Sequence, residues 1–292
     1  MRYFPTPYPD ELLGSLLIRA CHHLGLPPRA LVRLLADGSS DLVFLYPSFL
    51  RGLSHLTNLS PEDLLLNHTV FPYAAIGLPT TKRLVLEREL LMSTARGNSV
   101  RLRAAFGLHI ENLSRRRFCK KCCVEEYSQI GESYWHRRHA LPGIFVCPQH
   151  GEPLCISSVS VLPKLSTGNA KLPQEVVGNP VDWGLDMDGM QRLAAAVLEA
   201  TELPAETWDH VTEEYKRLTA CFDFEHHRQR RWGIDPMVLE FSRFYDERFL
   251  QKTGLALSSI GSDSWPARLV RGARPAMLLQ LRHVLLRLFL KF

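Results

Sequence analysis

The sequence predicts a mainly α-helical protein with a small metal-binding module between two helical regions. Apolar residues recur at helical spacing in the first and last thirds of the chain, with proline, serine or aspartate before them and glycine after them. Between these regions, two short cysteine and histidine pairs enclose a segment rich in aromatic and basic side chains. We therefore divide the 292 residues into an N-terminal helical domain (1–111), a zinc-finger module with short strands (112–156), an irregular linker (157–184) and a C-terminal helical domain (185–292).

The N-terminal third is expected to contain several short helices. Asp10 precedes leucines spaced three and four residues apart, so it is predicted to cap the first helix, which ends at Gly25. Pro28 opens a second helix, residues 60–63 combine a capping serine with a first-turn proline and two acids, and residues 80–95 form a further helix. A helix-turn-helix fold and ordinary helical packing both produce this pattern.

The C-terminal third is again predicted to be helical, and residues 157–183 before it are rich in Ser, Pro, Gly and Asn without a helical period. A basic connector, residues 225–232, separates the second and third expected helices. A DNA-reading helix-turn-helix needs such a turn, because a positive edge meets the phosphates while one helix enters the major groove. The four helices are expected at 188–200, 208–221, 236–251 and 275–290.

The most specific motif is a C-x2-C pair, Cys119 and Cys122, followed downstream by a C-x2-H pair, Cys147 and His150. A gap of two residues lets both side chains of a pair reach one metal ion, and two pairs supply the four donors that tetrahedral Zn²⁺ prefers. Because four protein ligands leave no coordination position for water, the zinc is expected to be structural. The chain has no H-E-x-x-H motif and no carboxylate cluster for two metals, so we expect no enzymatic activity.

The segment between the two pairs offers alternatives to this ligand set. His136 and His139 are candidate outer partners or alternative ligands of the metal, although such histidines more often pack or contact a partner. Tyr134 and Trp135 are expected to form the core of the module, because a small module has little other apolar material. The alternative is that these two rings stack on bases or on a protein partner.

Local charge indicates nucleic-acid binding. Residues 211–292 hold 14 Lys and Arg against 9 Asp and Glu, which accounts for the net charge of +5. Basic clusters of this kind attract phosphate backbones, although a solvated basic face gives the same pattern. The candidate DNA contacts are Arg115, Arg116 and Arg117 beside the first cysteine pair, Arg228, Arg230 and Arg231 in the basic connector, and Arg271 and Arg274 near the end of the chain.

Cysteine usage indicates a reducing compartment. Seven is an odd number, and three of the seven belong to the metal motif, which does not fit a disulfide framework. The remaining four are expected to be ordinary thiols: Cys21, Cys123, Cys155 and Cys221. Neither a signal peptide nor an apolar stretch long enough for a membrane span is recognisable, so we expect a cytoplasmic protein without membrane contact.

Four segments resemble the TniQ/TnsD family of transposon target-selection proteins: 4–15, 68–72, 119–151 and 264–286. The resemblance is most specific in 119–151, and 68–72 favours the TnsD branch. It implies a helix-turn-helix-like N-terminal domain, a zinc finger with ligands Cys119, Cys122, Cys147 and His150, and C-terminal helical domains that bind double-stranded DNA. Many TnsD relatives are longer, and this chain ends inside an apolar helix, so we expect a truncated form.

The resemblance also implies a function. A TnsD-like protein selects the attachment site of a Tn7-like transposon and recruits an AAA+ ATPase, usually called TnsC, to the bacterial nucleoid. A TniQ-like relative instead links a guide-RNA CRISPR complex to the transposition machinery. Two further classes stay open from the residues alone: a general zinc-containing transcription regulator with helix-turn-helix domains, and, with the least support, a zinc hydrolase or nuclease.

Overall fold

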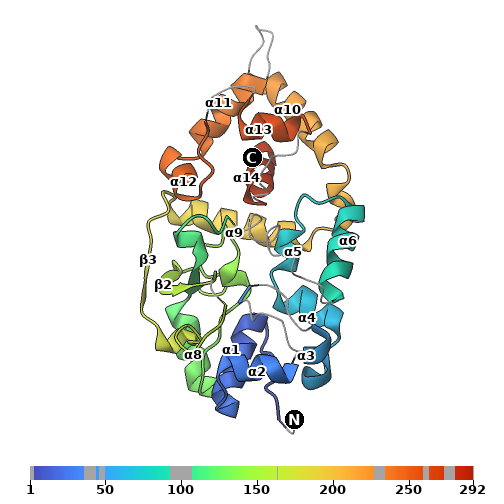
Figure 1. Cartoon of the computed structure of the whole chain (residues 1–292). Coiled ribbons are helices and arrows are strands. Elements are labelled where there is room, and N and C mark those ends of the chain that lie inside the picture. The colour runs from blue at the N-terminus through green and yellow to red at the C-terminus, as the bar shows by residue number, and fades with distance from the viewer. Residues whose placement is uncertain are drawn as a thin grey trace.

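The computed structural model describes residues 3–35, 44–45, 50–92, 107–162, 164–226, 234–258, 263–272 and 280–291. Within these ranges the protein is mainly helical with one small sheet, as the sequence predicts. The N-terminal helices lie at one end of the elongated molecule and the last helices at the other (Figure 1). The sheet and the long helix α9 (Met187–Glu202) lie between them.

Helix α1 (Leu13–Leu24) ends where the sequence predicts but begins differently. Gly25 adopts a left-handed conformation, with φ 64°, and its N–H bonds the carbonyls of Cys21 and His22. Asp10, the predicted cap, does not cap this helix: its own φ is +57°, and Leu12 precedes the helix without a side-chain cap. The carboxylate of Asp10 is used instead by the metal module, as described below.

The remaining N-terminal helices are short and separated by tight breaks: α2 (Pro28–Leu35), α3 (Leu50–Thr57), α4 (Pro61–His68), α5 (Phe71–Ala74) and α6 (Thr80–Leu91). Ser60 caps α4 as predicted, because its hydroxyl accepts a 2.9 Å hydrogen bond from the N–H of Asp63. Helix α3 was not predicted, and neither was α5, which forms one helical turn between α4 and α6. The predicted end of α6 lies outside the described residues.

Three short antiparallel strands form the sheet, in the order β1 (Arg115–Phe118), β2 (Cys155–Ser160) and β3 (Gly178–Pro180). Strands β2 and β3 lie largely in the segment predicted to be irregular, so that expectation is corrected. Phe118 pairs with Cys155, and Ile156 pairs with Asn179, which ties this segment to the metal module. Just before Cys147 the chain forms an isolated bridge, between Val146 and Pro153.

The C-terminal region contains α9, α10 (Val211–His226), α11 (Ile234–Phe244), α12 (Glu247–Lys252), α13 (Trp265–Val270) and α14 (Leu281–Lys291). The single helix expected at 236–251 is divided after Phe244, because Asp246 caps a new helix by accepting a hydrogen bond from the N–H of Arg248. Aromatic rings fill the centre of this region: Phe241 packs edge-to-face against Trp265 and Phe289.

Helix α14 joins the two helical regions. It packs against α9, α10, α11 and α13, and the side-chain amide of Gln280 just before it donates to the carbonyls of Ala74 and Ile76. The ring of His283 lies so close to Gly77 that a Cβ there would meet it at 2.5 Å. The end of α5 is therefore held by the last described helix of the chain. No described helix has both the length and the apolar character that crossing a membrane requires.

Candidate metal centre and its attachment to the N-terminal segment

The metal module presents its cysteine and histidine pairs from two rigid turns. Cys119 follows β1 and precedes helix α8 (Lys120–Ile130), and Cys122 lies in the first turn of that helix. The second pair lies on a tight turn in which the N–H of Gly151 bonds the carbonyl of Cys147 at 2.8 Å. Gly151 takes φ +66°, a conformation that favours glycine, so the turn can bring His150 back over Cys147.

The four predicted ligands meet at one point. The Nδ1 atom of His150 lies 3.5 Å from the sulfur of Cys119, 3.4 Å from that of Cys122 and 3.5 Å from that of Cys147. The sulfurs of Cys122 and Cys147 are 3.6 Å apart, far beyond the roughly 2.05 Å of a disulfide. The prediction that these four residues form one cluster able to hold a metal ion is confirmed.

The dimensions of the cluster match a zinc site. With Zn–S bonds of about 2.3 Å and Zn–N bonds of about 2.0 Å, a tetrahedron places two sulfurs about 3.8 Å apart and a sulfur about 3.5 Å from a nitrogen. The cluster's distances of 3.4 to 3.6 Å fall close to these values. Three thiols and an imidazole also bind Zn²⁺ in preference to hard cations such as Mg²⁺, because hard cations prefer oxygen ligands. The residues present therefore fit Zn²⁺.

The electrostatics of the cluster favour a bound cation. Hydrogen bonds from the thiols of Cys122 and Cys147 hold the pKa of Cys119 far below its usual range. The pKa of Cys122 is raised instead, because its own proton is shared with the sulfurs of Cys119 and Cys147. Three adjacent thiols therefore resist simultaneous ionisation, whereas a divalent cation stabilises all of them as thiolates.

A carboxylate outside the cluster orients the histidine. Glu125, on α8 one turn after Cys122, accepts a 3.0 Å hydrogen bond from the Nε2 atom of His150. This bond places the ring proton on Nε2 and leaves Nδ1 free to donate its lone pair to a metal. Glu125 was not predicted from the sequence, although an acid three residues after a helical cysteine ligand lies on the same side of the helix and therefore near the metal site.

His136 and His139, the alternative ligands, have other roles. His136 lies between two carboxylates, with Nε2 2.5 Å from Glu126 and Nδ1 3.7 Å from Asp10. Burial disfavours its charged form, but the hydrogen bonds to Asp10 and Glu126 outweigh burial and raise its pKa to about 9. Ligand atoms of Cys122, Glu126 and His136 also lie within 4.8 Å of one another, but both ring nitrogens of His136 face carboxylates and not the sulfurs of the main cluster. Burial, and then the charge of His136, lower the pKa of His139 to about 3.

The N-terminal segment is attached to the module by backbone hydrogen bonds. The N–H of Leu12 donates to the carbonyl of Trp135 at 3.0 Å, and the N–H of Trp135 donates to the hydroxyl of Ser15 at 2.9 Å. Asp10 accepts from the N–H of Arg138 at 3.1 Å and from the guanidinium of Arg137 at 3.1 Å. Two of the segments that carry the family resemblance, 4–15 and 119–151, are therefore in direct contact.

A buried ion network reinforces this attachment. The guanidinium of Arg19 bonds Glu11 at 2.7 Å and Glu132 at 2.8 Å and lies 3.8 Å above the ring of Tyr8. Burial raises the pKa of Glu11 to about 7 despite the opposing effect of Arg19. Trp135 is 1% exposed, and its indole N–H donates to a backbone carbonyl, so it forms core rather than a stacking platform. The network therefore connects α1 to the metal module.

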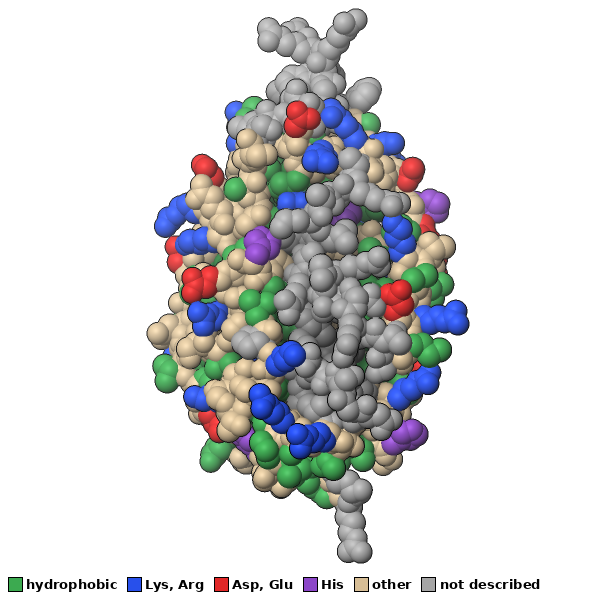
Figure 2. All heavy atoms as spheres, viewed as in Figure 1, with side chains coloured by type: hydrophobic (Ala, Val, Ile, Leu, Met, Phe, Trp, Pro, Cys, Tyr) green, Lys and Arg blue, Asp and Glu red, His purple; other side chains and the backbone are tan. Residues whose placement is uncertain are grey.

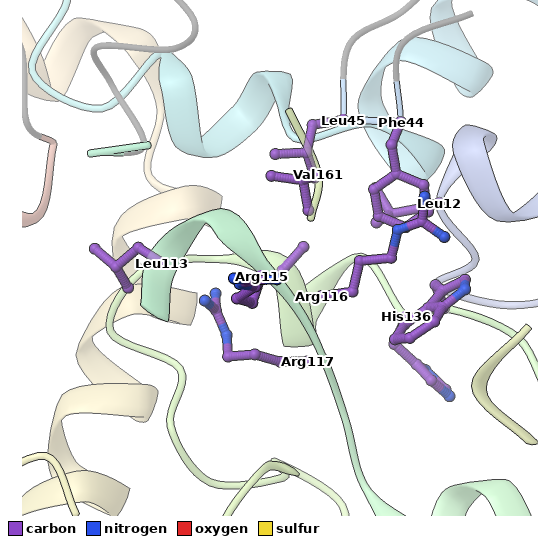
Figure 3. A pocket seen from close by; sticks show the side chains of 11 residues that line it. Leu12, Phe44, Leu45, Leu113, Arg115, Arg116, Arg117, His136 and Val161 are labelled. Carbon is purple, nitrogen blue, oxygen red and sulfur yellow. The ribbon is translucent and has the colours of Figure 1, made fainter. Parts of the chain in front are cut away.

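Two of the candidate DNA contacts beside the first cysteine pair are buried. Arg116 is 1% exposed and lies 3.9 Å from the ring of Phe44, and Arg117 is 3% exposed and donates to the carbonyl of His139. Figure 3 shows both side chains beside a cavity of about 10 Å³, which is room for about one water. The expectation of a surface run that grips phosphates or faces solvent is therefore corrected for these two arginines.

Burial also changes the charge balance of these side chains, because it lowers the pKa of Arg116 to about 9 and that of Arg117 to about 10. They are conspicuous in the sequence as charges, yet they act in the structure as long side chains that line the interior. The side chain of an arginine on a strand can point to the core or to the surface, and the residue type alone does not show which of the two it does.

Of the other candidates, Arg115 is half-buried and pairs with Glu111 at 3.2 Å, and Arg271 follows α13 with an exposed side chain. Three candidates of the basic connector, Arg228, Arg230 and Arg231, lie outside the described residues, as does Arg274. On the face shown in Figure 2, basic side chains are interspersed with acidic ones. Of the remaining cysteines, Cys21 and Cys155 are buried free thiols and Cys123 is half-buried, as expected, whereas the side chain of Cys221 is not among those described.

Comparison with known proteins shows which family the chain matches. A family model described as TniQ matches residues 2–154, which contain the N-terminal helices and the whole metal centre. The chain is similar to "Transposon Tn7 transposition protein TnsD" of Escherichia coli, with 28% identity over 157 residues. That match covers 52% of this chain and 31% of the length of the Escherichia coli protein.

Proposed function

The chain belongs to the TniQ family, and we propose that it selects the target site of a Tn7-like transposon by binding double-stranded DNA and recruiting a TnsC-like AAA+ ATPase. The observation that carries this proposal is the extent of the family match. It covers residues 2–154, the N-terminal helices and metal module that Asp10, Leu12 and Arg19 join into one unit. The similarity to TnsD supports the branch that recognises an attachment site.

The metal centre supports this function as a scaffold. Cys119 and Cys122 on one turn and Cys147 and His150 on the other would hold the Zn²⁺ ion, which would then link the two turns. Glu125 orients the histidine, and Glu126 connects α8 to His136 and through it to Asp10. Because four protein donors fill a tetrahedral site, we propose that the protein acts by binding and has no catalytic activity of its own.

DNA binding is proposed for the C-terminal region, with a helix-turn-helix-like arrangement around the basic connector. The support is the charge of Arg228, Arg230 and Arg231 between two helices, together with Arg271 and Arg274 further on. Changing Arg230 to alanine is expected to weaken binding to the attachment site and to lower the slope of log K against log[salt] by about one unit, as the loss of one phosphate contact requires. Arg116→Met, which removes a buried charge, serves as the matched control and should leave the slope unchanged.

A reconstituted transposition reaction tests the proposal. Transposase, AAA+ ATPase, donor DNA and a plasmid carrying the attachment site are combined with and without this protein. Insertion at the attachment site is expected only when the protein is present, and without any guide RNA. Site-specific insertion in its absence would refute the proposal. A requirement for a guide-RNA CRISPR complex would replace the attachment-site function by the adaptor function, and DNA binding without any interaction with the ATPase would favour a transcription regulator.

A further inference from the structure

Helix α8, which follows the first cysteine pair, lies at the periphery of the molecule (Figure 1) and makes few inward contacts. Cys122 is its only buried residue, and Cys123 and Glu126 are half-buried. The helix is attached by the metal cluster at its start and by Glu126, which accepts hydrogen bonds from His136 and from the N–H of Tyr134. Most of its surface therefore faces outward.

Among the charged and polar side chains of that outward surface, one stripe is apolar. Val124 is 69% exposed, Tyr127 is 58% exposed and Ile130 is 42% exposed. A spacing of three residues places these side chains next to one another along the helix. None of the three belongs to the core or packs against it in the described part of the chain, so packing there does not explain their apolar character. A continuous exposed apolar face of this kind is typical of a protein interaction site.

A positive charge at one end of the face indicates which kind of side chain a partner would place there. Lys120 lies four residues before Val124 and therefore on the same side of α8. It occupies the first helical turn, where a cation is disfavoured by the helix dipole. Lys121 is paired with Glu152 at 2.7 Å, whereas Lys120 forms no ion pair with any residue that the structure describes. A partner with a carboxylate at this position would compensate both the charge and the dipole.

We propose that this face of α8 (Lys120, Val124, Tyr127 and Ile130) docks into an apolar groove of a protein partner that has a carboxylate at the end facing Lys120. The inference rests on the proposed function, under which that partner is the AAA+ ATPase. A nucleic acid fits less well, because Val124 and Ile130 cannot stack on bases and Glu125 lies beside the face. The metal centre then has a direct part in recruitment, since Val124 follows Cys122 by only two residues.

The experiment measures binding of the purified AAA+ ATPase of the same transposon to the zinc-loaded protein. Val124→Glu is expected to weaken this binding at least about 30-fold, and Tyr127→Glu by a similar factor, because each places a charge in an apolar groove. The matched control is Val85→Glu on α6, where the valine is 54% exposed, and binding should stay within twofold of wild type. Zinc content and affinity for attachment-site DNA, measured on the same samples, should be unchanged in all three variants.

The outcomes separate the docking surface from the proposed function. If the wild-type protein does not bind the ATPase, both are refuted. If the wild type binds and both α8 variants bind equally well, the docking surface is wrong and the function stands. An equal loss in Val85→Glu would also overturn the assignment to α8. If light scattering shows a wild-type dimer that Val124→Glu dissociates, the face is covered by a second copy of this chain and the proposal fails.

Discussion

Loss of one metal ligand should disorder both the metal module and the N-terminal segment that rests on it. His150→Ala removes the nitrogen that lies 3.4 to 3.5 Å from all three cysteine sulfurs. Structural zinc contributes roughly 10–16 kcal/mol in zinc-finger peptides, whereas a whole domain is stable by only about 5–15 kcal/mol. The module therefore cannot remain folded without its metal. Residues 8–15 should loosen with it, because Leu12 and Asp10 bond directly to Trp135 and Arg138.

Two measurements check this prediction on the same samples. Native mass spectrometry should show one zinc ion in the wild type and none in His150→Ala. Hydrogen exchange should show loss of protection in residues 112–154 and in 8–15, with far smaller changes in α9. Cys123→Ser is the control, since Cys123 neighbours the cluster without belonging to it. Full zinc content in His150→Ala, or unchanged protection of 112–154 after zinc is lost, would refute the reasoning.

Three further predictions concern stability and use thermal or denaturant unfolding as the measurement. Arg19→Ala should cost about 3–5 kcal/mol, because it leaves two buried or nearly buried carboxylates without their partner; an effect below about 1 kcal/mol would contradict the network. Gly77→Ala should destabilise clearly more than Gly25→Ala: both need positive φ, but a Cβ meets a ring at 2.5 Å only at Gly77. The raised pKa of His136 contributes stability that is full below about pH 6.5 and is lost as the pH rises through about 9. His136→Gln should therefore make the free energy of unfolding depend less on pH between these two values.

Local rules predicted the parts of the fold that local forces determine. The glycine after α1, the Ser60 cap of α4 and the four clustered ligands all follow from short-range geometry, and each is confirmed. Asp10 failed for the same reason: its side chain satisfies the capping rule, but Arg137 and Arg138 compete for it from more than a hundred residues away. The capping rule takes account only of the few residues that follow in the sequence.

Strands β2 and β3 were missed because their residues have little intrinsic preference for a strand. Strand β3 consists of Gly178, Asn179 and Pro180, and β2 is rich in serine. Strand β2 pairs with β1, and β3 pairs with β2. Gly178 fits beside β2 only because it lacks a Cβ, which would lie 2.6 Å from the carbonyl oxygen of Ile156. Pairing between distant segments therefore overrides composition here.

The buried arginines explain why charge alone was a poor guide to the interface. Arg116 and Arg117 follow one another on β1 and lie at the seam where the N-terminal region meets the module. Arg19 lies at the same seam, as does the bond between Leu12 and Trp135. Arginine suits such a seam, because its long apolar stem packs while its planar head spans between rings and carbonyls. Arg19, which bonds both Glu11 and Glu132, and Arg137 and Arg138, which bond Asp10, therefore hold segments 4–15 and 119–151 together.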